Sequence, residues 1–258
     1  MEIFSRFAGS SGFFLDSERF VQSFYAPEPF GHHLRPSRSL LSAVYLTSIA
    51  LSGNEILTTH EPIFLSRALQ YASQAPSCTH PSNAKHGLQA EILIANYFFL
   101  RGHMQEGKSH INTAMMISMV HRAHKIHRIS NLDGVEVIEQ WERVKGFWSA
   151  YLLDKFWSIA GGLPPSSPDG VAGETRIDAP WPLELRQFKN VGTCVSRLFR
   201  PSYISCWRRF ILNKKCKDTI PLTGSLQTPL LHSQKRTFPS FLWLAKPRRC
   251  SIALIRSD

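Results

Sequence analysis

The chain has 258 residues, of which 43% are hydrophobic, and it carries 30 Lys and Arg against 19 Asp and Glu, a formal charge of +11. This composition excludes collagen-like, mucin-like and wholly disordered proteins, and it can build a hydrophobic core. Residues 187–258 alone hold 14 Lys and Arg and 2 Asp and Glu, so the first 186 residues are nearly neutral. The excess positive charge therefore belongs to this basic tail and indicates nothing about the partners of the body.

Neither a membrane span nor secretion is expected. The most apolar runs, Leu40–Leu51 and Ile92–Leu100, are shorter than the roughly 20 residues that a spanning helix needs. The first eleven residues lack the basic flank and continuous apolar segment of a signal peptide. Four of the five cysteines lie in the tail, and Cys78 stands alone in the body. This distribution favours a reducing compartment over a disulfide framework.

Turn signals divide the body into segments with helical periodicity. Capping residues and prolines predict helices over residues 16–25, 36–51 and 59–74, and a fourth over 82–100 has the cleanest apolar stripe. The three residues Arg101–His103 allow only a tight reversal, so we expect the next helix, through residues 111–119, to form a helical hairpin with the fourth. The longest helix is expected over 137–160, stopped by glycines and prolines.

These patterns predict an all-α protein. We expect an irregular array of antiparallel helix pairs followed by an aperiodic basic C-terminal tail. No alternating pattern in the body predicts a β-sheet, and no period of 3.6 or 2 continues beyond residue 186.

Residues 142–182 read ERVKGFWSAYLLDKFWSIAGGLPPSSPDGVAGETRIDAPWP. This segment resembles the middle homology region of fungal zinc-cluster transcription factors, the regulatory domain also found in xylanolytic activators. Upstream blocks agree in the family's order, so the resemblance covers roughly residues 11–185. The residues that match the family motif are Arg143, Phe147, Trp148, Tyr151, Asp154, Lys155, Gly162, Pro164 and Asp178, together with Glu142, Ser158, Pro180 and Pro182.

The resemblance implies a helical regulatory domain over residues 11–186, truncated relative to the family, that acts in the nucleus. Its expected role is control of DNA-templated transcription through other regulatory proteins, in some members in response to a small metabolite. It implies no catalysis. The family's DNA-binding domain needs six cysteines around two zinc ions, whereas only Cys78 precedes residue 187. We therefore expect no cofactor in this chain and only indirect or non-specific contact with DNA.

Two patterns in the body suggest chemistry but have simpler explanations. His121, His124 and His127 recur every three residues, yet on one helix the outer two point about 120° apart, which favours a solvated basic helix end over a metal site. Ser82 and Lys85 match the SxxK pattern of acylating serine enzymes, but the companion motifs are absent and helix capping explains the serine.

The long helix combines aromatic and charged residues, which permits two interpretations. Its aromatic side chains can simply pack in the core while its charges face solvent. Alternatively, they can form the wall of a pocket in which Arg143 or Lys155 meets an anionic metabolite.

The basic tail, residues 187–258, also permits two interpretations. Its abrupt change in periodicity, charge and cysteine content is typical of a disordered segment or of an error in the gene model, such as a shifted reading frame or a retained intron. Its paired cations interleaved with aromatics are alternatively suited to nuclear import or to nucleic-acid binding, with contacts from Arg208, Arg209, Lys214, Lys215, Arg248 and Arg249.

The resemblance leads us to expect a transcription-factor regulatory domain and no enzyme. Two alternatives remain open. The first is a helical protein that binds a small molecule or catalyses an unidentified reaction, and the second is nucleic-acid binding through the tail.

Overall fold

A computed structural model describes residues 1–73, 81–125, 134–167 and 176–182. All of these residues lie in the first of two compact units, Met1–Arg200. The described part is all-α and contains no strand. The helices in chain order are α1 (Glu2–Phe7), α2 (Ser17–Phe24), α3 (Arg38–Ser52), α4 (Glu55–Thr58), α5 (Glu61–Ala72), α6 (Pro81–Leu100), α7 (Met104–Val120), the 3-10 turn η2 (Ala123–Lys125) and α8 (Gly134–Gly161).

Local sequence signals set the ends of these helices. The Asp16 carboxylate accepts a hydrogen bond from the Arg19 amide at the start of α2, and the Ser37 hydroxyl accepts one from the Leu40 amide at the start of α3. Gly53 ends α3 in the left-handed conformation, with φ of 64°. The expected helices are confirmed, and five of them agree within three residues at each end because capping depends on neighbours in the sequence. The helix expected through residues 111–119 begins earlier, at Met104.

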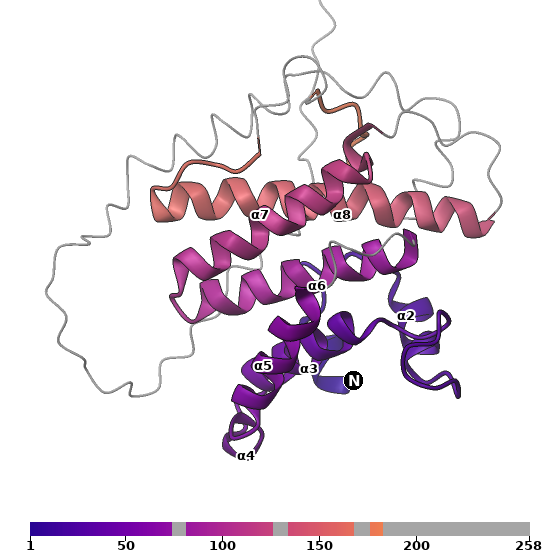
Figure 1. Ribbon diagram of the computed structural model, residues 1–258, viewed down its shortest axis with the longest axis vertical. Helices are drawn as coiled ribbons and strands as arrows, with labels where there is room; N and C mark the ends of the chain where they lie inside the picture. Colours follow the sequence, from indigo (N-terminus) through magenta and orange to yellow (C-terminus); the bar gives the residue numbers. More distant parts are fainter. Residues whose placement is uncertain (74–80, 126–133, 168–175, 183–258) are drawn as a thin grey trace, which may run out of the picture. The chain divides into compact units, whose positions relative to one another are not determined.

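Helix α6 is the centre of the core. It packs against α3, α5, α7 and α8, and every residue from Gly87 to Ala95 is buried. The single apolar stripe expected for this helix therefore understates its burial, because partners cover it on several sides (Figure 1). The two polar residues in this stretch have partners: Gln89 bonds the amide of Phe14 and the carbonyl of Gly12, and Glu91 bonds His110.

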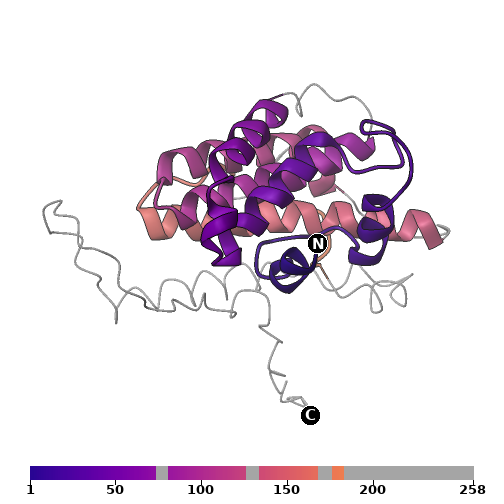
Figure 2. The ribbon, with the colours of Figure 1, turned by 90° about the horizontal axis from the view of Figure 1, so that it is seen from below.

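The sequence predicts no element over residues 1–10, but the structure has α1 there. Its Phe4 is buried and packs edge-on against Phe13, whose ring in turn packs against Phe20. Figures 1 and 2 show the N-terminal helix beside α3. One turn and a half of helix carries too little periodicity to be recognised, so tertiary contact stabilises it.

The link Arg101–His103 reverses the chain, with Gly102 at φ of 80°, and α7 packs along α6. Helix α8 then packs against both helices and is 28 residues long, which corresponds to about 42 Å. Within the described residues, no helix combines the length and the apolar character needed to cross a membrane.

The close approach of α6, α7 and α8 depends on Gly107, which leads to a testable prediction. A Cβ atom at this position would lie 2.5 Å from the Phe99 ring, which is stacked on Trp157 at 4.4 Å between centroids and cannot easily move. Gly107→Ala should therefore destabilise the fold by about 1–2 kcal/mol, because overpacking outweighs the gain in helix propensity. Urea unfolding followed by circular dichroism measures this change.

Gly9→Ala is the control for this substitution, because a Cβ atom there meets nothing within 4 Å. Its effect should stay within about 0.5 kcal/mol. Equal stability of Gly107→Ala and the wild type would show that the three helices are not packed as closely as described.

Candidate functional site

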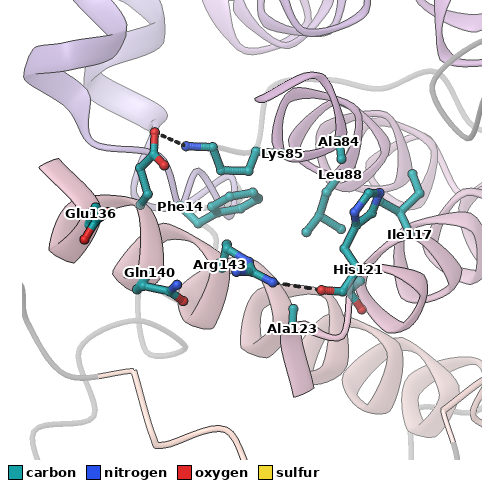
Figure 3. Close-up of a pocket in the computed structure, with 12 residues that line it drawn as sticks. Phe14, Ala84, Lys85, Leu88, Ile117, His121, Ala123, Glu136, Gln140 and Arg143 are labelled. Carbon is teal, nitrogen blue, oxygen red and sulfur yellow. Dashed lines mark hydrogen bonds and ion pairs between the residues drawn. The ribbon is translucent and has the colours of Figure 1, made fainter. Parts of the chain in front are cut away.

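A pocket of about 330 Å³ lies between α6, α7, η2 and α8 (Figure 3). Its wall is apolar where Phe14, Leu88 and Ile117 line it, and polar side chains gather mainly along α8. The lining residues are Phe14, Ala84, Lys85, Leu88, Ile117, Ser118, His121, Ala123, Glu136, Glu139, Gln140 and Arg143. An apolar pocket with a few placed polar groups is the usual form of a small-molecule site.

Three polar residues of α8 share one face of the helix. Glu136, Gln140 and Arg143 are four and then three residues apart, so they follow one another along a single stripe. Figure 3 shows the guanidinium of Arg143 directed into the pocket, where its Nη2 donates a 2.9 Å hydrogen bond to the carbonyl oxygen of His121. Burial lowers the pKa of Arg143, opposed by the charge of Glu139, and an arginine remains cationic at neutral pH.

Lys85 forms the opposite cationic group of the pocket. Its Nζ lies 2.6 Å from a carboxylate oxygen of Glu142 and 3.9 Å from one of Glu139. The second oxygen of Glu142 accepts a hydrogen bond from the Asp16 amide, so this ion pair also anchors the start of α2. Lys85 is therefore held in place by carboxylates. This placement fits a structural role for the lysine better than the acylating role that the SxxK pattern suggests.

The neighbouring His86 adds no positive charge at neutral pH. Burial, assisted by the charge of Lys85, lowers the pKa of His86 to about 4. Its neutral Nδ1 accepts a 3.3 Å hydrogen bond from the amide of Ser37, where α3 begins. The charges of this side of the pocket are thus those of Lys85 and its carboxylate partners.

The two cations proposed for a ligand are placed differently. Arg143 lines the pocket. Lys155 does not: its Nζ donates a hydrogen bond to the carbonyl of Ser167 and lies 5.1 Å from the centre of the Tyr151 ring. Lys155 therefore connects α8 to the segment that follows it.

Most of the other family-motif residues also connect α8 to the segment after it. Phe147, Trp148 and Tyr151 are buried in the core. The indole Nε1 of Trp148 donates a 2.6 Å hydrogen bond to the carbonyl of Pro180. Gly162 has φ of 65° and allows the Leu163 amide to bond the Ser158 carbonyl, which closes the helix end.

Asp154 is the centre of a network that we call the clasp, formed by Lys108, Asp154, Ser158, Ser166 and Ser167. The carboxylate is fully buried and accepts hydrogen bonds from Lys108 Nζ at 2.5 Å, from the amides of Ser166 and Ser167, and from the Ser167 hydroxyl. Lys108 also bonds Ser158 at 2.7 Å. Burial acts to raise the pKa of Asp154, but these hydrogen bonds outweigh it and the pKa lies below its ordinary value.

The remaining motif residues lie around this connection. The Ser158 hydroxyl is 3.4 Å from the carbonyl of Pro164. Asp178 forms ion pairs with Lys125 at 3.3 Å and Arg176 at 2.7 Å. The motif thus has a physical explanation within the described residues: its polar members hold α8, α7 and the segments 163–167 and 176–182 together.

One expectation about the histidines is wrong. His124 is only 5% exposed, and its carbonyl accepts hydrogen bonds from the amides of Asp178 and Ala179, so it does not lie at a solvated helix end. His121 lines the pocket, and His127 lies outside the described residues. Among the residues that are described, no three His, Cys, Asp or Glu side chains gather as metal ligands would.

The residues expected to contact nucleic acid or to direct import lie outside the described residues. These are Arg208, Arg209, Lys214, Lys215, Arg248 and Arg249. The same is true of the whole basic tail, residues 187–258. Its expected disorder or origin as a gene-model error stays a prediction, as does nucleic-acid binding.

Sequence reasoning did not identify most of the pocket. No motif in the sequence marks Phe14, Glu139 or Gln140, and Lys85 stands out only as part of SxxK. The polar stripe of α8 was a usable signal, because its spacing places those side chains on one face. The other lining residues come from separate segments that no sequence pattern connects.

Comparisons of this chain with protein-family models, with curated proteins and with solved structures found no match.

Proposed function

We propose that this chain is a regulatory domain that controls DNA-templated transcription in the nucleus, as the family motif in its sequence suggests. Its effector would be a small molecule bound between α6, α7 and α8. In this proposal the chain acts through other transcription-regulatory proteins and touches DNA indirectly or non-specifically. We also propose that the helices are arranged as an irregular array of antiparallel pairs, as in the expected regulatory domain.

The observation that carries the proposal is the pocket itself. Its volume of about 330 Å³ is at the lower end of the range typical of small-molecule sites, about 300–1,000 Å³. It lies among the helices that carry the motif blocks, with α6 on one side and the start of α8 on the other. A ligand there would contact three helices at once, so its binding would favour one packing arrangement over others.

The clasp supports the proposal in a second way. Most of the motif residues brace the C-terminal half of α8, whereas the pocket, which the motif residue Arg143 also lines, lies against its N-terminal half. A ligand in the pocket would therefore act on a helix that is anchored at its other end. This arrangement suits transmission of binding to a partner surface better than chemistry on a substrate.

The proposal is tested by fusing the full chain to an unrelated DNA-binding domain and measuring reporter transcription in a fungal host. We expect the fusion to change transcription relative to the DNA-binding domain alone. Ala84→Leu, which adds volume inside the pocket, should alter that effect. Asn83→Leu, its exposed neighbour on α6 outside the pocket, should leave it unchanged.

Circular dichroism and thermal melting of both variants establish that they fold. A fusion that behaves like the DNA-binding domain alone would contradict the regulatory role. Equal effects of Ala84→Leu and Asn83→Leu would contradict control through the pocket.

A further inference from the structure

The charges that line the pocket nearly balance. Two cations, Lys85 and Arg143, face two carboxylates, Glu136 and Glu139, and Glu142 pairs with Lys85 from outside the lining. A ligand that carries only negative charge would therefore meet both attraction and repulsion. An anionic metabolite, which is one of the ligands expected from the sequence, would therefore bind less tightly than Lys85 and Arg143 alone would predict.

One end of the polar stripe offers hydrogen-bond donors. The guanidinium of Arg143 carries five N–H groups, and its acceptor among the described residues is the single carbonyl of His121. The fork of a guanidinium matches the two oxygens of a carboxylate, and burial strengthens such a pair. This end of the pocket suits a carboxylate.

The middle of the stripe, one turn before Arg143, offers an acceptor. The side-chain oxygen of Gln140 is buried and has no hydrogen-bond partner among the described residues. Gln140 precedes Arg143 by three residues, so the two side chains are neighbours on α8, and Glu139 adds a carboxylate beside it. Gln140 and Glu139 both line the pocket, and an amide oxygen and a carboxylate are both acceptors, so this part of the pocket suits a ligand ammonium group, which supplies donors and a positive charge.

Side chains that suit a carboxylate and an ammonium group, one helical turn apart and beside an apolar wall, fit one class of small molecule. Phe14, Leu88 and Ile117 provide that wall. We propose that the pocket binds an α-amino acid with an apolar side chain, in its zwitterionic form. Its carboxylate pairs with Arg143, its ammonium group faces Gln140 and Glu139, and its side chain packs on the apolar wall. This inference rests on the proposed function, because it names the effector of the same pocket.

The test is calorimetric titration of the full chain at pH 7 with the twenty L-amino acids, followed by analogues of the tightest one. For leucine these are 4-methylpentanoate, which lacks the ammonium group, and 3-methylbutylamine, which lacks the carboxylate. We expect an apolar amino acid to bind and each analogue to bind at least about tenfold more weakly, since each loses one charge-assisted interaction. Gln140→Leu and Arg143→Gln should weaken the amino acid similarly, and Asn83→Leu should not.

The outcomes separate this inference from the proposed function. If the acid without an ammonium group binds as tightly as the amino acid, and Arg143→Gln abolishes binding, the pocket recognises only an anion and the zwitterion inference is wrong. If none of the twenty amino acids binds, the inference is also wrong. The reporter experiment above tests regulation independently of ligand identity. Should Arg143→Gln fail to fold without its bond to His121, Gln140→Leu still decides the result.

Discussion

Replacing Trp148 by alanine should destabilise the protein by about 3–5 kcal/mol. The side chain is 2% exposed and packs against Phe147, Tyr151 and Trp181, with ring centroids 4.9–5.6 Å apart. Its removal leaves a cavity and also leaves the Pro180 carbonyl without the indole donor. Equilibrium unfolding in urea measures the loss as a lower midpoint at similar slope.

Two further variants separate the causes of that loss. Trp148→Phe keeps most of the apolar volume and removes the indole N–H group, so its cost should be smaller, about 1–3 kcal/mol. Val120→Ala, at a position 71% exposed, should change stability by less than about 0.5 kcal/mol. A cost below about 1 kcal/mol for Trp148→Ala would mean that segment 176–182 does not cover α8 as described.

Replacing Asp154 by alanine should cost a similar amount, about 3–5 kcal/mol, because it removes one partner of a buried ion pair. Lys108, whose side chain is 11% exposed, would keep its charge without the counter-charge of Asp154, and the amides of Ser166 and Ser167 would lose their acceptor. Asp154→Asn, which keeps the size and one acceptor oxygen, should be less destabilising.

The clasp also predicts a pH dependence. The folded state lowers the pKa of Asp154 below its ordinary value, so the carboxylate binds protons less readily when folded than when unfolded. Its contribution to stability is therefore complete above about pH 4 and is lost as the pH falls through the folded pKa. The stability difference between the wild type and Asp154→Asn should shrink below about pH 4. A difference that stays constant or grows in acid would show that the ionised carboxylate does not stabilise the fold.

The sequence by itself determined the longer helices and most of their ends, but not α1 or α4. Ser37 and Gly53 bound α3, Asp16 begins α2, and Gly162 follows the last residue of α8. These signals act over three or four residues, through hydrogen bonds to the nearest turn, so they can be recognised without knowledge of the fold. The apolar repeat of α6 likewise predicted a buried helix before its partners were known.

The same local signals explain why the motif was recognisable and why its role was not. Asp154, Gly162 and Pro164 stand at definite spacings, and the end of α8 after Gly161 follows from the glycines and prolines alone. That Asp154 meets Lys108 could not be predicted, because 46 residues separate them and they come from different helices.

Only the tertiary structure decided which polar groups meet and where the pocket lies. Lys85 and Glu142 are 57 residues apart, and their ion pair exists because α6 packs against α8. Likewise, Lys155 is held by Ser167 and Arg143 lines the pocket, although both belong to one helix and share the same charge. Side-chain spacing specifies the face of a helix, but the partner that covers each face depends on packing between segments distant in the chain, which no local pattern encodes.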